Sequence, residues 1–140
     1  MIVILVDSSV WIDLLNDVVT EPVRRVRDLV PTTPLLVGDL ILLEVLQGLR
    51  NEAQARLVKR LLRRFDAISL LDPELAVRGA ANYRFLRRRG ITIRKTIDLI
   101  IGTFCIERGH ALLLADCARN PAWTTAPCCG KYGGDGSTRK

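Results

Sequence analysis

Two patterns of apolar positions alternate along this chain. Short, continuous runs of Ile, Val and Leu indicate strands buried on both faces, whereas apolar residues that recur every three or four positions indicate amphipathic helices. The patterns predict strands over residues 2–6, 35–37, 67–71 and 111–114, and helices over 10–15, 20–30, 38–49, 52–65, 72–89 and 97–108. Because strands and helices alternate and the strands are short and apolar, we expect an α/β fold with a parallel sheet between helices.

Residues that favour helix ends support these boundaries. Residues 7–9 (DSS) can cap the first helix, and Asn51 and Thr96 are expected to cap two later ones. Asp72, followed by Pro, is a strong helix start, and Gly109 is expected to end the helix over 97–108. The boundaries therefore follow from local chemistry as well as from periodicity.

Length and composition narrow the class of protein. The 140 residues are 49% hydrophobic, which is enough for one domain with a substantial core and argues against a disordered chain. No apolar run approaches the roughly 20 residues that cross a membrane. The apolar start over 1–6 is too short for a signal peptide and has no basic leader, so we expect a cytoplasmic protein.

The four cysteines are then expected to be reduced thiols. Cys105 lies in an apolar helical pattern and is expected in the core. Cys117, Cys128 and Cys129 lack the paired C-x-x-C spacing of zinc sites, which makes a zinc site a weak hypothesis.

The C-terminal segment differs in pattern from the rest. From residue 117 onward there is no periodic apolar signal, and glycines accumulate. We therefore expect one domain over residues 1–126 and a disordered tail over 127–140.

Three acidic residues are expected at one edge of the sheet. Asp7 directly follows the first strand, Asp116 follows the fourth, and Asp98 lies in the first turn of a helix that is apolar almost all round. Because the carboxyl ends of parallel strands share an edge, these side chains should converge there, with Asp98 partly buried. Each also has an ordinary explanation: a turn or cap for Asp7, a favourable helix dipole for Asp98, and a loop for Asp116.

Glu44 is the fourth acidic candidate. It lies in an apolar helical segment, although with Gln47 and Asn51 it could also form a solvated stripe. Converging carboxylates repel one another, by about 4 kcal/mol for two charges about 4 Å apart at an effective dielectric near 20. A divalent cation would relieve this repulsion, and oxygen ligands without His or Cys favour Mg²⁺ or Mn²⁺. Together with a net charge of +6, such a site indicates a nuclease.

Four segments resemble the motifs of PIN-domain proteins, specifically the VapC-type toxin ribonucleases of type II toxin–antitoxin systems. Residues 4–13 (ILVDSSVWID) resemble the opening motif of this family. Residues 43–49 (LEVLQGL), 96–102 (TIDLIIG) and 112–116 (LLLAD) resemble its second, third and fourth acidic motifs. The order and spacing agree over residues 2–116.

The resemblance implies a three-layer α/β/α fold around a parallel sheet of four or five strands. It also implies an Mg²⁺- or Mn²⁺-dependent endoribonuclease toxin that cleaves RNA phosphodiesters by metal-activated water. The partners that it implies are a cognate VapB-like antitoxin and a second copy of the chain, as a homodimer or within a toxin–antitoxin hetero-oligomer. An apolar patch for the antitoxin is expected, with the helices over 10–15 and 40–49 as contributors.

By carry-over from the family, the catalytic acids are Asp7, Glu44, Asp98 and Asp116, and the metal ligands among them are Asp7, Asp98 and Asp116. Ser8 and Thr96 occupy positions where the family often has a small hydroxyl residue near the site, and they can equally be plain helix caps.

Basic residues just ahead of the Asp98 helix are candidates for RNA binding, although cations also suit a solvated helix end. They are Arg87, Arg88, Arg89, Arg94 and Lys95. Trp11 could stack on a base, but core packing is the favoured interpretation.

Two other classes of function remain. Where the family has an Asp and then a Phe shortly after its fourth acid, this chain has Ala118 and Arg119. A PIN-fold RNA- or protein-binding module with a defective metal site is therefore an alternative. A phosphatase with an aspartyl nucleophile is disfavoured, because Ser9 stands where a D-x-D motif needs its second Asp. There is also no glycine-rich phosphate loop.

Overall fold

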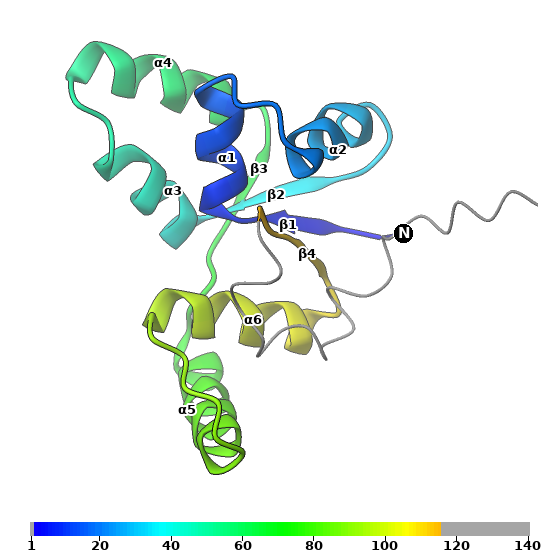
Figure 1. Cartoon of the computed structure of the whole chain (residues 1–140), viewed down its shortest axis with the longest axis vertical. Coiled ribbons are helices and arrows are strands. Elements are labelled where there is room, and N and C mark those ends of the chain that lie inside the picture. The colour runs from blue at the N-terminus through cyan, green and yellow to red at the C-terminus, as the bar shows by residue number, and fades with distance from the viewer. Residues whose placement is uncertain (1, 116–140) are drawn as a thin grey trace, which may run out of the picture.

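The structure is a computed structural model that describes residues 2–115 of the chain. Strands and helices alternate as the sequence predicts (Figure 1). The strands are β1 (Ile4–Val6), β2 (Leu35–Gly38), β3 (Asp66–Ile68) and β4 (Ala111–Leu113). The helices are α1 (Ser8–Leu15), α2 (Glu21–Leu29), α3 (Asp39–Gln47), α4 (Glu52–Leu62), α5 (Pro73–Arg88) and α6 (Thr96–Arg108).

The four strands that the structure describes form one parallel sheet in the order β3-β2-β1-β4. Ile4 of β1 pairs with Leu35 of β2 on one side and with Ala111 of β4 on the other. Helices α1 to α4 lie on one side of the sheet and α5 and α6 on the other (Figure 1). This arrangement confirms the predicted three-layer α/β/α fold with its parallel sheet.

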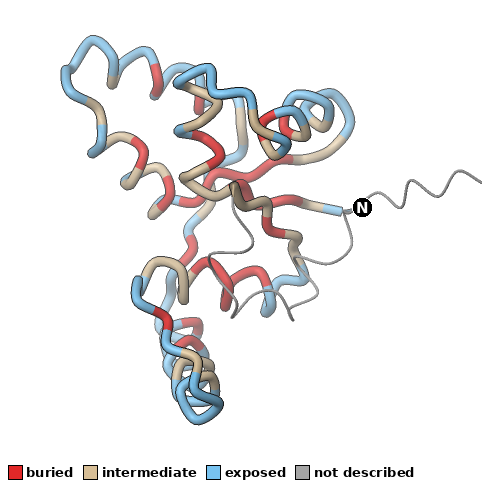
Figure 2. The backbone as a smooth tube through the Cα atoms, viewed as in Figure 1, coloured by how far each residue is buried: buried red, intermediate tan, exposed pale blue. Residues whose placement is uncertain are grey.

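The core lies on the two central strands and the helix faces against them (Figure 2). Every residue of β1 and β2 is buried, as their continuous apolar runs predict. Trp11 is only 1% exposed, and its ring packs against Phe65 with centroids 4.8 Å apart. The tryptophan is therefore a core residue, as the sequence analysis predicted, and is not available to stack on a base. Cys105 is also buried, which confirms its predicted place in the core.

The edge strand β3 ends earlier than predicted, at Ile68 instead of residue 71. The cause is Asp39, whose carboxylate accepts hydrogen bonds from Ser69 Oγ (3.1 Å) and from the backbone N–H of Leu70 (3.1 Å). These bonds draw the chain toward α3. Leu70 then packs so closely on Gly38 that a Cβ there would come within 2.3 Å of it, so this position requires glycine.

Most of the residues predicted to cap or end helices are confirmed in that role, and one is wrong. Asp7, Asn51 and Asp72 are N-caps whose side chains accept backbone hydrogen bonds, and Gly109 ends α6 in the left-handed conformation. Thr96, however, is the first residue of α6 rather than its cap. The N-cap is Lys95, which makes no side-chain capping bond.

Two smaller differences concern helix ends. Helix α1 begins at Ser8 rather than at residue 10, because Asp7 itself supplies the cap. Helix α4 ends at Leu62, three residues before the predicted end, and the chain turns there into β3.

Several expectations concern residues outside the described range. They are the fifth strand, the tail over 127–140, and the cysteines at 117, 128 and 129. Within residues 2–115, no helix is long and apolar enough to cross a membrane.

Candidate active site

Asp7 is fixed at the carboxyl end of β1 by its role as N-cap of α1. Its Oδ2 accepts hydrogen bonds from the backbone N–H of Ser9 (3.2 Å) and from Ser9 Oγ (2.6 Å). The same hydroxyl oxygen accepts a hydrogen bond from the backbone N–H of Ala115 at 3.4 Å. Ser9 therefore ties the chain that follows β4 to the carboxylate that follows β1, across neighbouring strands of the sheet.

Glu44 belongs to the same edge and not to a solvated stripe. It lies on α3, is half-buried, and its Oε2 accepts a hydrogen bond from Ser8 Oγ at 2.8 Å. Ser8 is the first residue of α1, directly after Asp7. A bond across 36 positions of the sequence thus places the Glu44 carboxylate beside the start of α1.

Asp98 completes a group of three acids that sense one another's charge. It lies half-buried in the first turn of α6, in the layer opposite α1 and α3. Burial first, and then the charge of Asp7, raise the pKa of Asp98 above its ordinary value. Lys95 opposes this shift, and Glu44 adds to it. The expected partial burial of Asp98 and its closeness to Asp7 and Glu44 are therefore present in the fold.

The donor set suits a hard cation in its chemistry. The charged groups that act on Asp98 are the carboxylates of Asp7 and Glu44 and the ammonium of Lys95, and within residues 2–115 His and Cys are not among them. Within residues 2–115, however, no three acidic, His or Cys side chains lie close enough together to form a ready metal-binding group. The side chains therefore fit Mg²⁺ or Mn²⁺ by type, and they would have to draw closer on binding.

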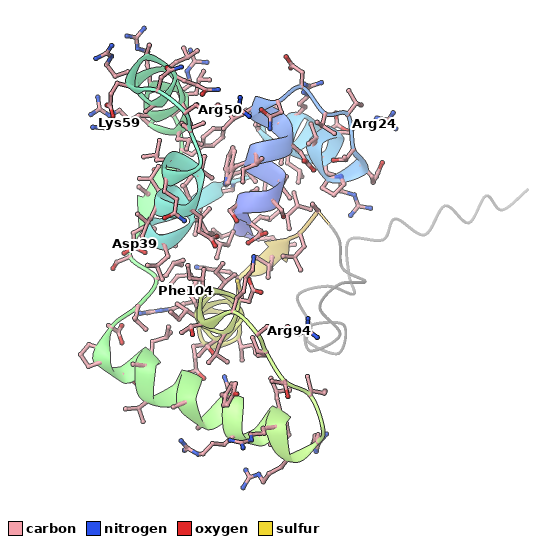
Figure 3. All side chains as sticks on the ribbon, turned by 60° about the vertical axis from the view of Figure 1, so that its left-hand side comes forward. Arg24, Asp39, Arg50, Lys59, Arg94 and Phe104 are labelled. Carbon is pink, nitrogen blue, oxygen red and sulfur yellow. The ribbon has the colours of Figure 1, made fainter. Side chains whose placement is uncertain are left out.

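The remaining predicted site residues are less closely tied to these acids. Asp116 lies outside the described residues, directly after Ala115. Thr96 is exposed, and within the described part of the chain its hydroxyl makes no hydrogen bond. The predicted basic residues are exposed; Arg94 lies on the segment just ahead of α6 (Figure 3).

A further acid, Asp39, lies at the same edge of the sheet and was not among the predicted site residues. Asp39 follows β2 as Asp7 follows β1, so the same signal, an acid directly after a buried strand, could have marked it. Its carboxylate is occupied by Leu40 N–H (2.8 Å) as well as by Ser69 and Leu70. Asp39 therefore holds the ends of β2 and β3 together.

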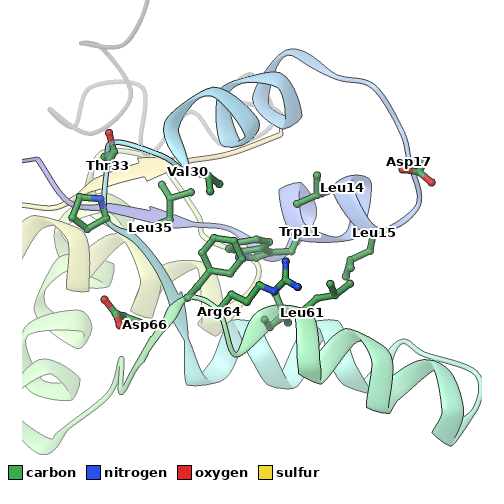
Figure 4. A pocket seen from close by; sticks show the side chains of 13 residues that line it. Trp11, Leu14, Leu15, Asp17, Val30, Thr33, Leu35, Leu61, Arg64 and Asp66 are labelled. Carbon is green, nitrogen blue, oxygen red and sulfur yellow. The ribbon is translucent and has the colours of Figure 1, made fainter.

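A cavity of about 620 Å³ lies at the opposite end of the sheet. Apolar side chains from α1 and α4, including Trp11, Leu14 and Leu61, form much of its wall (Figure 4). Leu35 and Asp66, at the starts of β2 and β3, close it on the sheet side. The cavity is thus separate from the acids, and the segment over 40–49 does not line it.

The fold and its acidic edge agree with a known family. The sequence model of the PIN domain matches residues 4–117, which is most of the chain. This chain belongs to the PIN domain family. The match spans all four segments that carry the acidic motifs, so Asp7, Glu44, Asp98 and Asp116 all lie within the PIN domain.

Solved structures with this PIN fold include toxin–antitoxin proteins. VapBC2 from Rickettsia felis, bound to a DNA fragment from its promoter, superposes with a TM-score of 0.71 at 15% identity; the match covers 86% of this chain and 95% of that one. DNA-bound VapBC from Salmonella typhimurium superposes with a TM-score of 0.65 at 19% identity. That match covers 80% of this chain and 85% of the other.

A third structure is that of a toxin that cleaves the sarcin–ricin loop, VapC20 from Mycobacterium tuberculosis. It gives a TM-score of 0.59 at 17% identity, and the match covers 82% of this chain and 91% of that one. At these identities the likeness establishes a shared PIN fold.

Proposed function

We propose that this PIN domain is a metal-dependent endoribonuclease that acts as the toxin of a toxin–antitoxin pair. The observation that supports this most is the convergence of Asp7, Glu44 and Asp98, from three different elements, at the carboxyl edge of the sheet. Like charges are not brought together in a half-buried site without a compensating role, and a divalent cation supplies one. Membership of the PIN family and the fold shared with VapC toxins point the same way.

In this proposal Asp7, Asp98 and Asp116 hold Mg²⁺ or Mn²⁺, and Glu44 lies close by. A bound metal of this kind activates water and offsets negative charge on phosphate. Ser8 and Ser9 are positioning residues, because their hydroxyls donate to Glu44 and Asp7 and fix the direction of each carboxylate. Burial first, and then the charge of Asp7, raise the pKa of Asp98, and a bound cation would offset both by stabilising its charged form.

The substrate in this proposal is RNA. The chain has a net charge of +6, and the residues just before Asp98 are basic and exposed. Such a surface attracts the phosphate backbone, and its contribution weakens as salt rises. Lys95 is close enough to Asp98 for its charge to lower the pKa of that carboxyl.

The partner in this proposal is a VapB-like antitoxin that binds the toxin and blocks the acidic edge. Structures that share the fold are VapBC complexes, which supports this assignment. The apolar cavity lined by Trp11, Leu14 and Leu61 is the place where apolar side chains of such a partner would fit. Helix α1 lines this cavity, and α3 does not.

A binding module without cleavage is the second candidate. The observation that favours it is that no three of the acidic side chains within residues 2–115 already form a metal-binding group. Such a protein would bind RNA or a partner through the same surface and leave the RNA intact. A single measurement distinguishes the nuclease from the binding module.

That measurement is cleavage of structured RNAs by the pure protein with Mg²⁺ or Mn²⁺, with EDTA, and with two variants. We expect Asp98→Asn to lower the cleavage rate by at least about 100-fold, the scale of losing a group that stabilises reacting charge. Asp39→Asn is the matched control, because it removes one carboxylate charge from the same edge at a residue that only joins strands. It should leave the rate unchanged.

Two results would contradict the nuclease. Cleavage that survives in Asp98→Asn and in EDTA would trace to a contaminating enzyme or to other residues. An absence of cleavage, together with an absence of Mn²⁺ binding by calorimetry, would favour the binding module.

A further inference from the structure

The exposed aromatic side chain of the described region lies at the far end of α5. Of the Phe, Tyr and Trp residues within 2–115, only Phe85 is classed as exposed, at 47%. The guanidinium of Arg89 lies over its ring, 4.4 Å from the centroid. Residues four apart share a face of a helix, so the ring and the guanidinium are in contact and both are exposed to solvent.

Positive charge is concentrated around this ring and is not neutralised by acids. Arg84, Arg87 and Arg88 are exposed, and none of them forms an ion pair with another residue of the described chain. At the other end of the same helix, Arg78 does have a partner, Glu107 of α6, at 3.5 Å. The acids thus support the packing of the first half of α5 and leave its last turns uniformly basic.

The segment that joins this end of α5 to Asp98 is packed in place. Ile93 is buried against Tyr83 and Leu86 of α5 and against Leu99, the neighbour of Asp98 on α6. Ile91 belongs to the same small cluster, and its N–H donates to Leu86 O at 3.0 Å. Ile91 and Ile93 pack into this cluster, whereas Arg94 and Lys95, the next residues of the connector, are exposed; Arg94 is labelled in Figure 3.

We infer that the last turns of α5 and this connector form a surface that guides single-stranded RNA to the acidic edge, with Phe85 and Arg89 as a platform on which an unpaired base stacks. The inference rests on the proposed nuclease function and names the way in which its substrate is held. Arg84, Arg87 and Arg88 bind the phosphates beside the stacked base, and Arg94 and Lys95 continue the basic path toward Asp98.

Nucleic acid fits this surface better than a protein does. A hydrophobic protein interface excludes unpaired charges from its centre, whereas four of the six residues from 84 to 89 are arginines. Aromatic rings and guanidinium planes set among phosphate-binding cations are the usual means by which proteins hold single strands. A second copy of the chain would bring the same positive charge to the contact.

Base stacking can be separated from phosphate binding with two probes. One is a fluorescent oligouridylate and the other an oligomer of the same length that lacks its bases. Binding is measured by fluorescence anisotropy in EDTA, so that nothing is cleaved, over a range of salt. We expect Phe85→Leu to weaken oligouridylate binding by about tenfold, the scale of one lost stacked base, and to leave binding of the abasic probe within about twofold.

The arginines should respond differently. Arg87→Gln and Arg88→Gln should each weaken both probes and reduce the salt dependence by about one phosphate contact, which is a slope change near 0.7 for single strands. Val77→Ala is the matched apolar control, since Val77 is 72% exposed two turns earlier on the same face of α5. Arg56→Gln removes one exposed charge from α4, in the opposite layer, and serves as the charge control.

The outcomes are distinct. If Phe85→Leu binds both probes like the wild type, the stacking platform is wrong; if it instead weakens self-association or antitoxin binding, the face docks a protein. Equal losses for both probes would also overturn stacking. If Phe85→Leu shows the base-dependent loss but the wild type cleaves no RNA with Mn²⁺, the platform stands and the nuclease proposal fails. If it cleaves RNA and Phe85→Leu binds normally, the reverse holds.

Discussion

The two ends of the sheet differ in what their side chains contribute. At the amino end, apolar side chains surround a cavity, and Trp11 packs on Phe65 while its Nε1 donates to Val6 O at 3.1 Å. At the carboxyl end lie Asp7, Glu44 and Asp98, and the pKa of Asp98 is raised by burial and by the charge of Asp7. Helix α1 belongs to both ends, since it begins at Ser8 beside the acids and carries Trp11 to the cavity.

The two ends of the sheet contribute to stability in opposite ways. Burial of apolar surface at the amino end stabilises the fold. Like charges brought into a half-buried site at the carboxyl end destabilise it, and functional sites commonly carry such a cost. Substitution of a buried apolar residue at the amino end should therefore lower the free energy of unfolding, whereas removal of the Asp98 charge at the carboxyl end should raise it.

The largest effect is expected at the amino end. Trp11→Ala removes a ring that is 1% exposed and leaves the Val6 carbonyl without its donor, so the free energy of unfolding should fall by about 3–5 kcal/mol. Urea denaturation followed by circular dichroism measures it, with Phe65→Leu as a milder change in the same pair. A loss below about 1 kcal/mol would mean that the amino end is not the stabilising one.

A smaller loss is expected from an acid that works as a structural residue. Asp39→Ala removes three hydrogen bonds, two of which join the end of β2 to the chain after β3, and should cost about 1–2 kcal/mol of unfolding free energy. Mn²⁺ affinity by calorimetry should stay unchanged, because Asp39 is not one of the converging acids. A loss of Mn²⁺ affinity in this variant would show that the carboxyl end is not divided as described.

The smallest effect has the opposite sign. Asp98→Asn removes the repelled charge and should raise the free energy of unfolding at neutral pH by about 0.5–1 kcal/mol, a gain that solvent limits because Asp98 is only half-buried. The fold holds the proton of Asp98 more tightly than the unfolded chain does. The destabilisation therefore develops as pH rises from the ordinary pKa of 3.8 through the raised pKa.

The stability difference between wild type and Asp98→Asn should accordingly vanish below about pH 3.8 and be fully present at neutral pH. Thermal unfolding over a pH series measures it, and Asp39→Asn controls for loss of charge at the same edge. A neutral-pH stability lower in Asp98→Asn than in the wild type would refute the view that this carboxylate is repelled.

Local chemistry made much of the fold predictable. Continuous apolar runs located β1 and β2, and capping residues such as Asp72 located helix starts. The early end of β3 was not predictable, because it depends on Asp39, about 30 positions away, which takes the N–H of Leu70. The prediction of Thr96 as a cap was also wrong, because α6 begins one residue earlier than predicted and places Lys95 at the N-cap.

The sequence predicted which edge of the sheet carries the acids, but it did not predict the hydrogen bonds that hold them there. A parallel sheet brings acids that follow its strands to one edge, and this placed Asp7 and Asp98. The bond from Ser8 to Glu44 and that from Ala115 to Ser9 join residues far apart in sequence. No periodicity encodes such pairs, and so Ser9 was missed as a positioning residue.

The strand order β3-β2-β1-β4 has a further consequence. The chain moves outward from β1 to β2 and β3 with its helices in one layer, then returns past β1 to β4 with α5 and α6 in the other (Figure 1). The direction of winding thus reverses between β1 and β4, and at such a switch point the connections diverge and leave a crevice beyond the strand ends. Asp7 and Ala115, joined through Ser9, flank that reversal. Winding topology alone therefore opens space for a ligand there, before any side chain is chosen.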